Sequence, residues 1–242
     1  MDIRLALMTG IDIPIPQMQL TLHQPTIQEI SFLGEQDFFT AVHLLTLDKE
    51  VLIEDESVSS QLTNFQVLMK VIEQMDANKK APLYSLFSLL FPEHRMVLMP
   101  KSIVLMGNET ENVMIDENNF QTFQDVLKEV LCVSNLFQGN NVVYKPANAA
   151  AKRIADKIMR GRRKVAEMKE KSNDSVFARY ISILTIGLAS MTLQDCTALT
   201  MFQLFDLVER FNLFTEWDIN LRARLAGGTP KSEAENWMKS IH

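Results

Sequence analysis

The apolar residues of this chain recur mostly at the three- and four-residue spacing of a helix face. In the N-terminal half this spacing predicts helices over five segments: 26–33, 38–45, 63–75, 83–91 and 119–133. Two of the segments open with the spacing of a capping box, in which Thr26 precedes Glu29 and Thr63 precedes Gln66. Gly34 follows the first segment and predicts its end. The acidic and polar residues 48–60 predict a loop.

Short apolar or alternating runs predict a smaller β component. Residues 3–8 and 18–22 fit two strands of an antiparallel ribbon, with Pro14 and Pro16 in the connection or on an edge. The apolar spacing then changes from helical to strand-like over three further runs: 96–99, 102–106 and 112–115. Residues 107–110 predict a turn between the last two runs. These runs give the clearest hairpin signal in the chain.

The C-terminal part has helical spacing throughout. A polar, glycine-containing break at 138–141 predicts a boundary between an α+β part with two short β-hairpins, residues 1–138, and an all-α helical part, residues 139–242. The second part is expected to hold a basic helix within 145–171, a buried helix over 176–191, and further helices over 201–213, over 217–226 and from Thr229 onward. Thr200 and Gln203 form the capping box at the start of the predicted helix 201–213. The predicted fold class is therefore mainly α with a small β component.

The overall composition is that of an ordinary globular protein. Hydrophobic residues make up 47% of the chain and charged residues 22%, which excludes a disordered or fibrous protein. Cys132 and Cys196 are too few for a disulfide framework, so we expect two buried thiols and a reduced cytoplasmic environment. The N-terminus lacks the features of a signal peptide, and Arg179 interrupts the longest apolar run, which is also too short for a membrane span.

The net charge of −6 hides a strong asymmetry along the chain. Residues 1–144 carry 8 basic and 19 acidic side chains, residues 145–171 carry 10 and 3, and residues 172–242 carry 6 and 8. Ala151, Ile154, Ile158, Val165 and Met168 form a heptad seam in the basic segment, with Gly161 at the seam position between. Cations flank this seam and are the candidate partner-binding residues: Lys152, Arg153, Lys157, Arg160, Arg162, Arg163 and Lys164.

Three interpretations of this basic segment stay open. It can bind nucleic acid through phosphate contacts, pair with acidic protein, or form a solvated face. The acidic partner could be the N-terminal part of this same chain or another subunit. No aromatic residue interleaves the cations to stack on bases, so protein pairing is favoured over nucleic acid.

The sequence contains no motif for catalysis or for a metal ion. The four histidines lack metal-ligand spacing, and there is no Gly-x-Ser-x-Gly elbow or glycine-rich phosphate loop. The acidic run 54–56 lacks the alternating ligands and central glycine of a calcium loop. We therefore expect no catalytic residues, no metal and no cofactor, and predict that the protein is not an enzyme.

The chain is also rich in adaptable apolar side chains, with 14 methionines and 14 phenylalanines. Methionine fills gaps in cores and also lines binding surfaces that accept several partners, and a core role is the default. The apolar stretch 201–214 predicts a helix buried on most sides, with a helix that leaves one face for a partner as the alternative.

Several short segments, in their order along the chain, carry a family resemblance: Pro25–Glu29, Leu204–Phe211, Arg222–Gly228 and Asn236–Lys239. Together with the apolar runs that precede them, they resemble the small, mostly helical tail-assembly chaperones and baseplate-hub assembly proteins of tailed bacteriophages. That resemblance implies a role in building the tail or baseplate, in the infected bacterial cytoplasm or in the virion. It implies other tail or baseplate proteins, or further copies of the chain, as partners. A nucleic-acid-binding accessory protein that uses residues 145–171 is the alternative.

Overall fold

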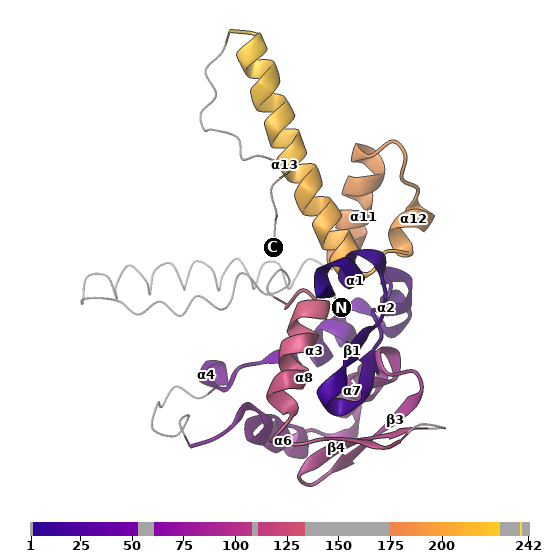
Figure 1. Ribbon diagram of the computed structural model, residues 1–242, viewed down its shortest axis with the longest axis vertical. Coiled ribbons are helices and arrows are strands. Elements are labelled where there is room, and N and C mark those ends of the chain that lie inside the picture. Colours follow the sequence, from indigo (N-terminus) through magenta and orange to yellow (C-terminus); the bar gives the residue numbers. More distant parts are fainter. Residues whose placement is uncertain (1, 53–60, 108–110, 134–174, 228–237, 239–242) are drawn as a thin grey trace, which may run out of the picture.

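The computed structural model describes residues 2–52, 61–107, 111–133, 175–227 and 238, and helices form most of its ordered elements (Figure 1). The fold is mainly α with a small β component, as predicted. The expected boundary at 138–141 and the basic segment 145–171 both lie outside the described residues.

Five helices of the N-terminal half match the predicted segments: α2 (Ile27–Leu33), α3 (Glu35–Thr46), α6 (Asn64–Gln74), α7 (Ala77–Leu90) and α8 (Phe120–Val130). The helices α1 (Ile3–Thr9) and α4 (Lys49–Leu52) were not predicted. Both predicted capping boxes form, and Gly34 ends α2. Helix α7 begins earlier than predicted because the carboxylate of Asp76 accepts a hydrogen bond from the backbone N–H of Lys79.

The expected strand over residues 3–8 is wrong, since these residues form helix α1. The carboxylate of Asp2 caps this helix by accepting hydrogen bonds from the N–H groups of Arg4 and Leu5. Gly10 ends it with a left-handed φ of 71°. Residues 49–52 likewise form α4, a helical turn within the segment that was expected to be a loop.

The predicted antiparallel ribbon does form, but with a different first strand. Strand β1 (Ile13–Ile15) pairs with β2 (Leu20–Leu22), and Pro14 lies opposite Thr21 with its ring exposed. A 3₁₀ turn over residues 16–18 connects the strands. The prolines therefore lie on an edge and in the connection, as their lack of an N–H donor requires.

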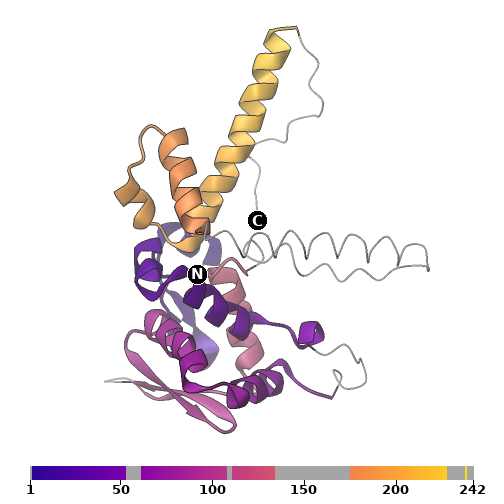
Figure 2. The same cartoon turned by 180° about the vertical axis from the view of Figure 1, so that it is seen from behind.

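Strands β3 (His94–Met99), β4 (Ser102–Gly107) and β5 (Val113–Ile115) form an antiparallel sheet in that order. Side chains alternate between its two faces. One face joins the core through five buried side chains: Met96, Ile103, Leu105, Val113 and Ile115. Figures 1 and 2 show this sheet at the end of the molecule opposite the tip of the last helix.

Phenylalanine rings from α7 and α8 form the centre of the core. The ring of Phe123 stacks on that of Phe87 at a centroid distance of 6.0 Å and lies 6.1 Å from Phe91 and 6.2 Å from Phe120. Beside this cluster the buried side-chain amide of Gln124 donates to the carbonyl oxygens of Leu45 and Leu47 and so ties α8 to the end of α3.

The C-terminal elements are α11 (Val176–Gly187), α12 (Leu193–Thr197) and α13 (Met201–Leu225). Helix α11 is not the buried helix that was expected, since it ends at Gly187 and buries only Phe177 and Leu184. The predicted helices 201–213 and 217–226 are one continuous helix, α13. No glycine or proline interrupts the sequence between them, so nothing forces a break.

These C-terminal elements share the core of the N-terminal half. The rings of Phe39 and Phe177 lie 5.3 Å apart, and the Nε2 of Gln203 donates to the carbonyl oxygen of Met8 at 2.8 Å. Glu35 accepts hydrogen bonds from the N–H of Val176 and from the hydroxyl of Ser175. The capping box at Thr200 forms as predicted and sets the start of α13.

Two absences apply to the described part of the chain. None of its helices is long and apolar enough to cross a membrane. No group of its histidine, cysteine, aspartate and glutamate side chains could hold a metal ion.

Candidate functional site

The predicted partner-binding cations, Lys152 through Lys164, fall outside the described residues, so the structure does not place them. Within the described ranges, three features could take part in binding. They are the outward face of the three-stranded sheet, the polar hollow beside His23, and the far half of α13.

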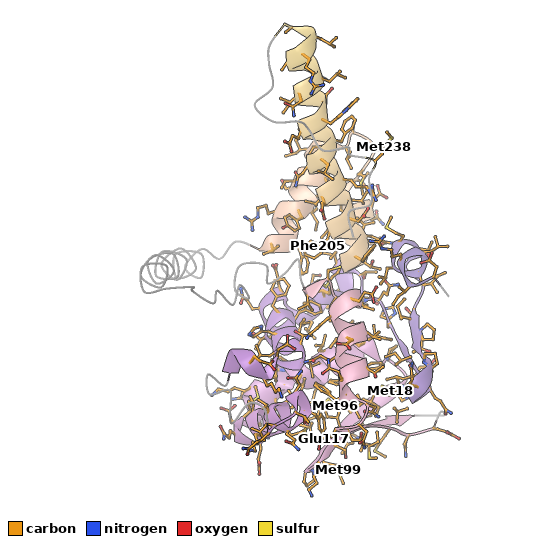
Figure 3. All side chains as sticks on the ribbon, turned by 60° about the vertical axis from the view of Figure 1, so that its left-hand side comes forward. Met18, Met96, Met99, Glu117, Phe205 and Met238 are labelled. Carbon is orange, nitrogen blue, oxygen red and sulfur yellow. The ribbon has the colours of Figure 1, made fainter. Side chains whose placement is uncertain are left out.

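The outward face of the sheet is apolar where a solvent-facing sheet is ordinarily polar. The strand register places Val97 beside Val104, and Val104 beside Met114. We call this surface the outer sheet face, formed by Arg95, Val97, Met99, Ser102, Val104, Met106 and Met114. Its three methionines are between 45% and 53% exposed. Figure 3 shows Met96 inside the body and Met99 at the lower end of the molecule.

The sequence pattern does not reveal this surface, because methionines are expected in the core by default. The alternation within 102–106 does reveal the two faces of a strand, but both sets of positions are apolar. The strand register shows which residues share a face. The burial of Ile103 and Leu105 shows which face the core covers.

The polar hollow has a volume of about 840 Å³ and lies between the β1–β2 ribbon and the start of β3. His23 lines it, with its Nδ1 2.9 Å from Asp12 and its Nε2 3.4 Å from Glu29. The same Glu29 carboxylate accepts hydrogen bonds from the N–H and hydroxyl of Thr26. These contacts belong to the cap of α2, so the geometry supports a structural role for His23 and Glu29.

Glu29 gives the cap of α2 a measurable pH response. Burial tends to raise the pKa of its carboxyl, but hydrogen bonds from Thr26 and the contact with His23 outweigh burial and hold the pKa below its ordinary value of 4.5. A carboxyl with a lowered folded-state pKa stabilises the fold above its unfolded pKa. That contribution disappears as pH falls through the folded value.

We therefore expect Glu29→Gln to lower the free energy of unfolding by roughly 0.5–1 kcal/mol near pH 7, given partial solvent screening of the side chain. The difference from wild type should shrink as pH falls below 4.5. Urea unfolding at several pH values measures it. Glu111→Gln, at an exposed position outside any cap, is the control and should show no such pH-dependent difference. A difference that stays constant down to pH 3 would contradict the role given to the ionised cap.

Both cysteines lie in the core, as predicted, and neither forms a disulfide. Burial, together with the nearby charges of Asp206 and Glu129, raises the pKa of Cys132 to about 12. Burial and the adjacent Asp195 also raise the pKa of Cys196. Thiols that stay protonated are poor nucleophiles, so neither is suited to covalent catalysis.

Helix α13 changes character along its length. Its buried side chains all lie between Met201 and Val208, and Phe211 also packs against the core. Figures 1 and 2 show the rest of the helix extending past the other described elements. The expected burial of 201–214 is therefore confirmed only for its first turns, and a face left for a partner stays a prediction.

A comparison with known protein families gives a match in the C-terminal region that contains α13. A family model described as the YomV second domain matches residues 169–242. No curated protein and no solved structure matches the chain. The matched family is phage-derived, of the Bacillus phage SPbeta-like kind. The C-terminal third of this chain, which contains α11, α12 and α13, is therefore similar to a domain of a phage-derived protein family.

Proposed function

We propose that this chain is a non-enzymatic structural or assembly protein of a bacteriophage tail or baseplate, acting through protein–protein contacts. The match of residues 169–242 to a phage-derived family supports the phage setting. The resemblance of its short segments to tail-assembly chaperones and baseplate-hub assembly proteins supports the tail or baseplate role. Its place of action would be the infected bacterial cytoplasm, the virion, or both.

The outer sheet face is the observation that supports a role in protein–protein contacts. Three half-exposed methionines surround Val104 on a surface that water would otherwise cover. Contiguous exposed apolar surface of this kind marks interaction sites, and flexible methionines adapt to the shape of a partner. A protein partner that buries this face would remove the cost of its exposure.

A lysate of infected cells provides the test. The tagged full chain should capture tail or baseplate proteins identified by mass spectrometry, and Met99→Lys/Met106→Lys/Met114→Lys should lose them. The control is Leu5→Lys/Met8→Lys, which places lysines at exposed apolar residues of α1, away from the sheet. Circular dichroism checks that both variants stay folded. A chain that captures no tail or baseplate protein would contradict the proposal.

The basic residues 152–164 support a second candidate, a nucleic-acid-binding accessory protein. In that case DNA or RNA retention should fall steeply with salt and should drop when Arg160, Arg162 and Arg163 become alanine. Without retention at low salt this candidate fails, and pairing with acidic protein and a solvated face are the two interpretations of the segment that stay open.

A further inference from the structure

Strand β3 forms one edge of the three-stranded sheet, since β4 is its one strand neighbour in the described part of the chain. Met99 and Ser102 flank a two-residue turn and therefore form a hydrogen-bonded pair. Such pairs alternate along an antiparallel ladder, so Val97 is also bonded to β4, and the N–H and C=O groups of Met96 and Leu98 point away from it. Within the described ranges these groups have no hydrogen-bond partner.

The edge formed by β3 lacks the features that usually protect one. Proteins protect edge strands with charged residues, prolines and bulges. Residues 96–99 contain no charge and no proline, and their register with β4 continues without a bulge. Strand β5, at the opposite edge, spans only 3 residues, and the carbonyl oxygen of Met114 there accepts a hydrogen bond from the side-chain amide of Asn119. Strand β3 is therefore the edge that can accept another strand.

We infer that β3 pairs in antiparallel orientation with β3 of a second copy of this chain, about a two-fold axis beside Val97. In this register Met96 of each copy forms a hydrogen-bonded pair with Leu98 of the other, so the N–H and C=O groups on this edge gain partners. The register also places the exposed Glu93 of each copy opposite the exposed Lys101 of the other. Opposite charges thus meet at both ends of the contact, and this complementarity identifies a second copy as the partner.

The neighbouring registers fit less well. With the axis one residue later, Arg95 would lie opposite Lys101, which places two positive charges side by side. With the axis one residue earlier, the pairing would need the N–H of His94, which already donates to the carbonyl oxygen of Phe91 at 3.0 Å. The axis beside Val97 is therefore the register that the strand favours.

The charge around Glu93 adds a second reason for Lys101 to lie there. Glu93 lines the polar hollow together with Asp12 and Glu111, and none of the described residues that line the hollow is a lysine or an arginine. The carboxylates at this end of the sheet thus outnumber the lysine and arginine side chains beside them. Lys101 of the second copy would supply a positive charge at the rim of the hollow.

Reversal of the charges at the ends of the contact tests the pairing. Light scattering after size exclusion should give about twice the chain mass of 27.6 kDa for the wild type. Lys101→Glu should shift the mass toward that of one chain, because it places two acidic residues opposite each other. Glu93→Lys/Lys101→Glu exchanges the two charges and should restore the dimer. A wild-type chain with the mass of one copy would overturn the pairing, and a double variant as monomeric as Lys101→Glu would overturn its register.

A substitution at the two-fold axis tests the position of the contact. Val97→Lys should give the mass of one chain, since the axis brings the two lysines together. Val104→Lys is the matched control and should remain dimeric, because Val104 lies beside Val97 on the same face but on the central strand. Circular dichroism checks that both variants stay folded. A dimeric Val97→Lys chain would contradict the inference.

The pairing can fail or hold separately from the proposed function. Met106→Lys/Met114→Lys changes β4 and β5 and leaves the β3 edge intact, so this variant should remain dimeric while it loses tail or baseplate proteins. Loss of the dimer in this variant would contradict pairing through β3. A dimeric wild type that captures no such protein would contradict the proposed function alone.

Cross-linking through an introduced cysteine tests the orientation. Val97→Cys should form a disulfide with its own copy under mild oxidation, because the two Cα atoms lie about 4.5 Å apart across the axis. Val104→Cys should not, since three strand spacings, about 14 Å, separate its two copies. The buried native cysteines should stay unlinked. A Val97→Cys chain that links no better than Val104→Cys would overturn the inference.

Discussion

Replacing Phe123 with alanine is expected to lower the free energy of unfolding by about 3–5 kcal/mol. The Phe123 ring is fully buried and lies within 6.2 Å, centroid to centroid, of the rings of Phe87, Phe91 and Phe120. Its removal leaves a cavity between α7 and α8 that the two helices cannot fill without shifting. Chemical unfolding followed by circular dichroism measures the loss.

Phe32→Ala is the control for this substitution. Phe32 has the same side chain on the same half of the molecule, but its ring is 83% exposed. Its replacement should change stability by less than about 0.5 kcal/mol, as for other surface positions. Equal losses for the two variants would mean that the aromatic cluster does not form the centre of the core.

The second large effect is expected at Gly187, the last residue of α11. A Cβ atom at this position would lie 2.2 Å from the Cζ of Phe211, far inside van der Waals contact. Although alanine favours helix over glycine, Gly187→Ala should destabilise the protein by about 1–3 kcal/mol because the packed Phe211 ring must shift. Thermal unfolding of the variant shows whether the clash with Phe211 outweighs the helix preference of alanine.

A double-mutant cycle assigns this loss to the contact. In a Phe211→Leu background the clash is relieved, so Gly187→Ala should cost much less there than in the wild-type background. Ser182→Ala, at an exposed position of the same helix, should be nearly neutral. If Gly187→Ala proved as harmless as Ser182→Ala, the close approach of α11 and α13 would be disproved.

Features that depend on neighbours in the sequence were predictable. The capping boxes at Thr26, Thr63 and Thr200 all form, because a cap is an interaction between residues three positions apart. The β4–β5 hairpin also forms, since a turn between two short apolar runs is a local signal.

Features that depend on distant contacts could not be predicted. Residues 3–8 are mostly apolar and suit a strand or a helix equally. The Asp2 cap is a local signal for the helix that the prediction missed, and the distant contacts with α13 also favour the helix. The outer sheet face is a second case, because packing of the core on the opposite face of the sheet leaves Met106 and Met114 facing outward. The partner-binding cations at 152–164 stay a prediction.

The close contact between Gly187 and Phe211 has a consequence for geometry. Together with the hydrogen bond from Gln203 to Met8, it anchors the base of α13 at two points on different elements. A helix anchored in this way cannot rotate independently of the N-terminal half of the molecule. The fold thus fixes the angle and the spacing between the tip of α13 and the sheet at the opposite end (Figure 1). The tip of α13 and the sheet are therefore held at a set separation, as at the two ends of a rigid spacer rather than of a flexible tether.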